Sequence, residues 1–159
     1  MSRSGSLLAL VIATLAALNV TTVTGQGFTN INLIPANNGH LGSEFKLDCG
    51  FTYADAVSIV RKVHFYRKRQ NDPNFLEIAN ADTQASPTYR WNDTALQSRS
   101  NFTMLNRTSF RITIRSLECG DKAEYRCMYR VGNRDSEYAI FSDAKALEMP
   151  GSCTAPGDC

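Results

Sequence analysis

The residue types able to carry out chemistry in this chain are five cysteines, two histidines and a modest number of carboxylates. Neither the Gly-x-Ser-x-Gly turn of serine hydrolases nor the His-Glu-x-x-His pair of zinc proteases occurs. No cysteines have Cys-x-x-Cys spacing, and His40 and His64 lie far in sequence from Cys119, Cys153 and Cys159. We therefore expect neither an enzyme nor a metal site, and no cofactor.

The first 25 residues have the pattern of a secretory signal peptide. One basic residue, Arg3, precedes an apolar run at 7–18, which is shorter than the roughly 20 residues of a membrane-crossing helix. Cleavage after Gly25 would leave 159 − 25 = 134 residues, and the loss of Arg3 would change the net charge from +2 to +1. We therefore expect a secreted, extracellular protein in which disulfides form.

Residues 26–149 are expected to form one domain, followed by a Gly/Pro/Cys tail at 150–159. Nothing after residue 25 is apolar over transmembrane length, so we expect no membrane span. The polar tail also lacks the hydrophobic end of a lipid-anchor signal, which favours a released protein. A chain that stops at Cys159 can also be the front part of a longer receptor, and this alternative stays open.

The composition, 43% apolar and 20% charged, is that of a chain with a packed core, which excludes wholesale disorder and a collagen-like fibre. A net charge of +2 is too small for a dedicated nucleic-acid-binding protein, so we expect no nucleic-acid partner.

Alternating apolar and polar residues, separated by turn-forming residues, predict an all-β protein. The predicted strands are Thr29–Ile34, Glu44–Cys49, Val60–Lys68, Phe75–Ala79, Phe102–Leu105, Ser109–Arg115, Ala123–Val131 and Tyr138–Leu147. So many short strands in about 120 residues favour two packed sheets. The alternation predicts a shared core of Phe45, Leu47, Cys49, Val63, Phe65, Phe110, Ile112, Ile114, Tyr125, Cys127 and Tyr129.

The run from Asp121 to Cys127, DKAEYRC, resembles the Asp-x-Ala/Gly-x-Tyr-x-Cys motif of immunoglobulin-superfamily domains. Residues 112–117 and 45–49 resemble the strands E and B of that family, and the resemblance extends over residues 28–148. It implies a two-sheet antiparallel immunoglobulin-like β-sandwich with Greek-key connections. The 78 residues between Cys49 and Cys127 suit the longer, variable-type domain.

Two positions depart from the family pattern. Phe65 stands where strand C normally has tryptophan, and the sole tryptophan, Trp91, lies elsewhere. The last strand region, 138–149, lacks the Gly-x-Gly bulge of antigen-receptor variable domains. We therefore expect the sandwich without antibody-like pairing of two domains.

The resemblance also implies scaffold roles for several residues. Cys49 and Cys127 face the core from different sheets and should be disulfide-bonded, which stabilises by about 4 kcal/mol in the chain-entropy model. Tyr125 is placed for a tyrosine corner beside Asp121. Arg67 is expected to pair with Glu118 or Asp121, and Arg99 is a second candidate partner for Asp121.

Three further cysteines, Cys119, Cys153 and Cys159, leave an odd thiol. Both Cys119–Cys153 and Cys153–Cys159 are open as local pairs. The remaining cysteine would then stay free, join two chains in a disulfide-linked dimer or bond to a following domain.

Glycosylation sequons begin at Asn92, Asn101 and Asn106, and a fourth at Asn19 falls inside the signal peptide. The three mature sequons predict glycans on the D–E side of the sandwich. Such glycans would leave the opposite sheet as the better surface for a partner; in the family's lettering it holds strand C with Phe65, strand F with Cys127, strand G at 138–149, and strand C′.

On that sheet the outward positions predict a cationic, aromatic binding face made of His64, Tyr66, Lys68, Arg126, Met128 and Arg130. The basic run 61–69 could attract a heparin-like sugar or an acidic protein. The loops 52–58 and 131–136 are expected to carry specificity. We expect an immunoglobulin-like recognition module that binds a protein or surface glycan in adhesion or immune-type recognition, with the ectodomain of a longer receptor as the alternative.

Overall fold

The computed structural model describes residues 27–36, 38–53, 59–83, 86–132, 136–151 and 153. The predicted signal peptide, Cys159, and residues 54–58 and 133–135 of the predicted specificity loops lie outside the described residues. Among the described residues, no helix has both the length and the hydrophobicity needed to cross a membrane.

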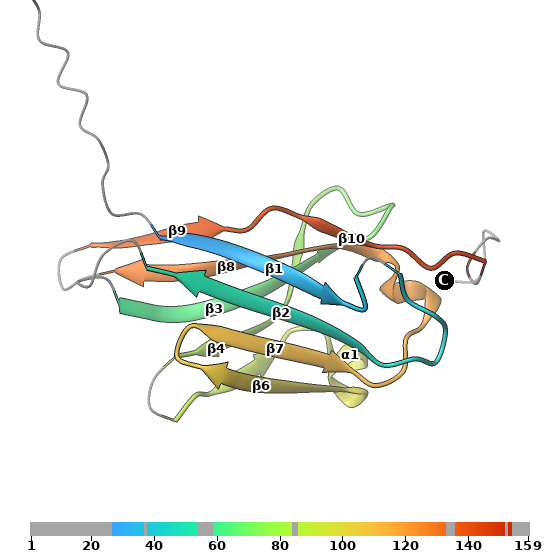
Figure 1. Ribbon diagram of the computed structural model, residues 1–159, viewed down its shortest axis with the longest axis horizontal. Coiled ribbons are helices and arrows are strands. Elements are labelled where there is room, and N and C mark those ends of the chain that lie inside the picture. The colour runs from blue at the N-terminus through green and yellow to red at the C-terminus, as the bar shows by residue number, and fades with distance from the viewer. Residues whose placement is uncertain are drawn as a thin grey trace, which may run out of the picture.

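The described chain forms two packed antiparallel sheets, as predicted (Figure 1). Sheet I has the order β1-β2-β7-β6, from strands β1 (Phe28–Ile34), β2 (Phe45–Thr52), β7 (Ser109–Ile114) and β6 (Ser100–Asn106). Sheet II has the order β10-β8-β3-β4-β5, from β10 (Lys145–Leu147), β8 (Ala123–Gly132), β3 (Ile59–Lys68), β4 (Leu76–Asp82) and β5 (Tyr89–Trp91). β9 (Glu137–Phe141) also pairs with β8.

The core lies between the sheets because apolar residues alternate along the strands. In β7, Phe110, Ile112 and Ile114 are fully buried, while the residues between them are partly exposed. All the residues predicted for the shared core are buried, with at most 1% of each exposed. Period-two alternation was therefore sufficient to identify both inner faces.

The predicted strand at 138–147 is wrong as one element, because it is broken between β9 and β10. The Ser142 N–H donates to the carbonyl oxygen of Cys127 at 2.9 Å, and the Ser142 hydroxyl accepts from the Cys127 N–H at 3.0 Å. Ser142 therefore satisfies both backbone groups of Cys127 where the ladder is interrupted.

Two short elements were not predicted, β5 and the helix α1 (Thr94–Ser98). Each is too short to show a period. The helix begins where the Asp93 carboxylate accepts the Leu96 N–H at 2.9 Å, an N-cap that only structure makes visible.

The position where the family has tryptophan lies on β3 and is filled by Phe65, which pairs in register with Cys127 and is 1% exposed. Trp91 lies on β5, where its ring meets the edge of Phe102 at 6.0 Å between centroids. The substitution of phenylalanine for tryptophan thus leaves the core closed.

Candidate functional site on the outer face of sheet II

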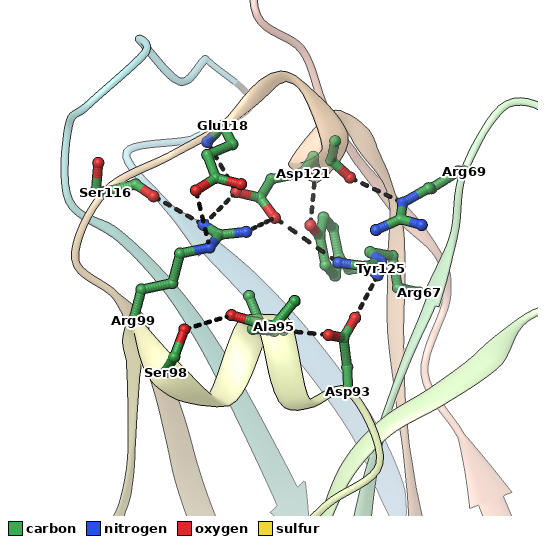
Figure 2. Close-up of polar contacts among 12 residues, drawn as sticks. Arg67, Arg69, Asp93, Ala95, Ser98, Arg99, Ser116, Glu118, Asp121 and Tyr125 are labelled. Carbon is green, nitrogen blue, oxygen red and sulfur yellow. Dashed lines mark hydrogen bonds and ion pairs between the residues drawn. The ribbon is translucent and has the colours of Figure 1, made fainter. Parts of the chain in front are cut away.

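An ion network holds the end of the sandwich where α1 meets the turn Cys119–Asp121 (Figure 2). The Arg99 guanidinium donates two hydrogen bonds to the Asp121 carboxylate, at 2.6 and 2.7 Å. Asp121 is fully buried, and its hydrogen bond raises the pKa of Arg99. Arg99 is therefore the principal partner of this carboxylate.

Arg67 approaches the same network from β3 and lies beside two acids. Its Nη2 donates to the Asp93 carboxylate at 2.6 Å, whereas its Nη1 lies 3.7 Å from Asp121. The expected ion pair with Asp121 is thus confirmed, whereas the nearer partner, Asp93, was missed because α1 was not predicted. Burial alone would raise the pKa of Asp93, but its hydrogen bond from Leu96 and its pairing with Arg67 lower it.

Tyr125 belongs to the same scaffold. Its buried hydroxyl donates to the backbone carbonyl of Asp121 at 2.7 Å, which is the geometry of a tyrosine corner. Burial raises the pKa of Tyr125 far above its usual value. These residues are therefore fully occupied within the chain and position the turn rather than a ligand.

Two disulfides are present, Cys49–Cys127 across the sheets and Cys119–Cys153 between the turn and the tail. The second bond decides between the two local pairings that the sequence left open. Together with the fold, the two bonds fit an extracellular domain.

The predicted binding residues lie together on the outer face of sheet II. β3 and β8 pair Tyr66 with Arg126 and His64 with Met128, and cross-strand partners share one face of a sheet. On β4, Glu77 pairs with Tyr66, and on β9, Phe141 pairs with Met128, so both residues lie on the same face. We call this surface the outer face; its residues are His64, Tyr66, Lys68, Phe75, Glu77, Arg126, Met128, Arg130 and Phe141.

Arg126 lies at the centre of the outer face, among aromatic rings. Its guanidinium carbon is 4.1 Å from the ring centre of Phe75, 4.7 Å from that of Phe141 and 5.6 Å from that of Tyr66. Cation–π attraction of this kind fixes the side chain without using its N–H groups. Phe141 remains 48% exposed, so the aromatic surround opens to solvent.

Two of the predicted face residues are covered by their neighbours, because His64 is only 7% exposed and Met128 only 5%. His64 stacks on Tyr66, with 6.2 Å between ring centres, and its Nδ1 lies 2.9 Å from the Glu77 carboxylate. Burial lowers the pKa of His64, against the opposing effect of Glu77. His64 is therefore a packed, neutral part of the face near pH 7.

Glu77 accepts hydrogen bonds from three side chains, His64, Asn80 and Asn92. Burial alone would raise its pKa, but these bonds lower it below its usual value. The carboxylate is thus ionised and already satisfied. Three residues of the outer face were not predicted from the sequence: Phe75, Glu77 and Phe141. Only Phe141 had a sequence signal, because the alternation along β9 places it on the outward side.

The basic run 61–69 does not form one cationic patch. Arg67 turns inward to the ion network and is 5% exposed. Lys62 lies 3.9 Å from Asp82, and Arg130 lies 3.4 Å from Glu137 at the margin of the face. Basic residues that were expected to attract a heparin-like sugar therefore lie beside different acids and do not form one continuous cationic surface.

The sequons are not all on one side, contrary to the prediction. Asn101 and Asn106 are exposed on β6 of sheet I. Asn92 follows β5 of sheet II, and its side-chain nitrogen donates to Glu77 at 3.0 Å. A glycan on Asn92 would thus border the outer face, while glycans on the other two would lie on the opposite sheet.

Comparison with known proteins rests on the fold, because no protein-family model matches the chain and no curated protein is similar to it in sequence. Murine CRIg is 11% identical with a TM-score of 0.60, and the match covers 76% of this chain and 97% of that chain. A chain from a structure on T cell specificity and activation by the bacterial superantigen toxic shock syndrome toxin-1 is 15% identical with a TM-score of 0.57, over 76% of this chain and 98% of that one. The variable-type subclass stays a prediction. The strand arrangement and these likenesses show that the chain has an immunoglobulin-like fold.

Proposed function

We propose that the protein is a secreted recognition module, not an enzyme, and that it binds a protein ligand through the outer face of sheet II. The observation that carries the proposal is the exposed aromatic ring of Phe141 beside a ring-held arginine, Arg126. Aromatic residues and arginine are the types that dominate the centres of protein–protein interfaces. The aromatic side chains around Arg126 are packed on a rigid sheet, so they lose little conformational freedom when a ligand binds.

A protein ligand fits the face better than a sulfated sugar. Such a sugar requires a row of unneutralised cations, whereas Lys62 and Arg130 lie beside acids and Arg67 is buried. Glycans on Asn101 and Asn106 would shield sheet I, whereas a glycan on Asn92 would only border the outer face.

The cysteine count is compatible with the alternative function, the N-terminal ectodomain of a longer receptor. Two disulfides use four of the five cysteines, so Cys159 has no cysteine partner left within this chain. A disulfide-linked dimer would use the same residue. Intact mass of the secreted protein, with and without reductant, distinguishes a covalent dimer from a monomer with one alkylated thiol.

The experiment that tests the face compares two exposed phenylalanines on opposite sheets. A multimerised form of the protein is screened against an array of extracellular proteins, and the hits are measured again with Phe141→Asp and with Phe28→Asp. Phe28 is 61% exposed on β1 of sheet I and serves as the matched control. We expect Phe141→Asp to weaken binding at least about tenfold, the effect of losing a central interface anchor.

Phe28→Asp should leave the affinity unchanged. Equal affinity of wild type and Phe141→Asp for every hit would overturn the assignment of the outer face. Loss of binding in both variants, with native melting temperatures, would also contradict it.

A further inference from the structure

We propose that Arg126 is the anchor for a carboxylate, an aspartate or glutamate side chain that a protein partner presents next to an apolar residue. This inference rests on the proposed function and adds the chemistry of the ligand. It follows from what Arg126 lacks, from the hydrogen bonds that neighbouring acids make to other side chains, and from the rings that surround it.

The side chain of Arg126 forms no hydrogen bond or ion pair with any described residue. Its Nε is buried and has no hydrogen-bond partner, although the guanidinium has five N–H donors. The three aromatic rings hold the group in place but accept none of these donors as an oxygen atom would. Arg126 is therefore oriented before any ligand arrives, with its hydrogen-bonding capacity unused.

Two acids near Arg126 already have partners among other side chains. Glu77 accepts from His64, Asn80 and Asn92, and Glu137 pairs with Arg130 at 3.4 Å. The feature left unused at the centre of the outer face is therefore the set of N–H donors on Arg126. A carboxylate is the complementary group, since it accepts two parallel N–H bonds from a guanidinium.

The surroundings of Arg126 select the kind of carboxylate. Phe75, Tyr66 and Phe141 form an apolar border, and Phe141 is 48% exposed beside the charge. An acid that is flanked by an apolar side chain can pack on Phe141 while its carboxylate meets Arg126. A sugar acid offers Phe141 less apolar surface, because hydroxyl groups surround its carboxylate.

The test uses small probes and the full secreted protein after glycan removal. Benzoate combines a carboxylate with an apolar ring; benzamide keeps the ring without the charge; glucuronate keeps the charge on a polar ring. Binding of each is measured by saturation-transfer difference NMR at constant ionic strength. The proteins are wild type, Arg126→Gln, Arg126→Lys and the control Arg111→Gln, which removes an arginine from the outward side of sheet I.

We expect benzoate to bind wild type and Arg111→Gln equally, and to bind Arg126→Gln about tenfold more weakly, because a charge-assisted bidentate contact is lost. Arg126→Lys should fall between them, since it keeps the charge but not the paired donors. Benzamide and glucuronate should each bind wild type at least about fivefold more weakly than benzoate.

Benzoate binding that is unchanged in Arg126→Gln, or absent in wild type, would overturn the carboxylate anchor. Glucuronate binding as tight as benzoate would overturn the protein ligand in favour of an acidic glycan. The proposed function fails separately, when Phe141→Asp leaves protein binding intact. If benzoate does not bind through Arg126 but Phe141→Asp abolishes binding of the protein ligand, only the inference about Arg126 is refuted.

Discussion

Arginines occupy two contrasting settings in this molecule. At the end of the sandwich, Arg99 binds Asp121 through two hydrogen bonds, and Arg67 binds Asp93 (Figure 2). On the outer face, Arg126 is held by rings and donates to no described residue. At the end of the sandwich, the N–H donors of the arginines bind carboxylates and stabilise the scaffold. On the outer face, aromatic rings hold the guanidinium in place and its N–H donors stay unused.

The difference teaches how to separate structural from ligand-binding arginines in a small β-sandwich. A carboxylate partner consumes both the charge and the hydrogen-bonding directions of arginine, so such a residue has little left for a ligand. An aromatic surround stabilises the charge without consuming either. Pre-orientation with free donors is the combination that a binding site requires.

The largest effect should follow from breaking the scaffold setting. Asp121→Asn removes the charge from a fully buried carboxylate that two arginines approach, and we expect the free energy of unfolding to fall by about 3–5 kcal/mol. Arg126→Gln should cost less than about 1 kcal/mol, the usual size of an exposed cation–π contact. Guanidinium denaturation of both variants makes the comparison, and similar losses would contradict the division into two settings.

A second effect, smaller and dependent on pH, should come from His64. Its folded pKa is lowered by burial, below its usual value near 6.5, so the unfolded chain binds the proton at higher pH. Stability should therefore fall as the pH drops below about 6.5, and this loss should level off below the folded pKa of His64. Glu77, whose pKa is lowered from 4.5, adds a further loss as the pH falls below that value.

The measurement is the free energy of unfolding at a series of pH values, for wild type and His64→Gln. The variant should show a flatter slope between pH 7 and 5, because its amide does not titrate. An identical slope in both proteins would show that His64 does not contribute.

The smallest effect should come from an arginine that is paired but exposed. Arg111 donates two hydrogen bonds of 2.6 Å to Asp48, which resembles the geometry at Asp121. Its side chain is 27% exposed and that of Asp48 is 20% exposed, so water screens the pair. Asp48→Asn should change the free energy of unfolding by less than about 1 kcal/mol in urea titrations. A loss as large as that in Asp121→Asn would show that geometry, rather than burial, sets the energy.

Much of the fold follows from the sequence because it depends on local alternation. Apolar residues such as Leu47 and Ile112 recur at every second position and so identify the inner face of each strand. The segment from Asp121 to Cys127 also carries a motif with fixed geometry. The site was predicted only in part. Outward alternation places Arg126 and Tyr66 on one face, but it does not indicate which side chains from other strands pack against them.

The errors arose where contacts are distant in sequence. His64 was expected to be exposed, and its burial depends on neighbours from β4 and β8. The nearer of the two acids that pair with Arg67 was missed, because Asp93 lies 26 residues away on an unpredicted helix cap. Asn92 was placed with the other sequons on the basis of sequence proximity, although the chain changes sheets between β5 and β6.

The Cys119–Cys153 bond has a mechanical consequence. It closes a loop of the chain that contains β8, β9 and β10. β10 has only three residues and would peel from β8 under tension, one pairing after another. Force on the chain beyond Cys153 instead passes through the sulfur atoms into the turn at Cys119 and onward towards β7. The strands that carry Arg126 and Phe141 lie inside the closed loop, so a pull on the tail reaches neither of them.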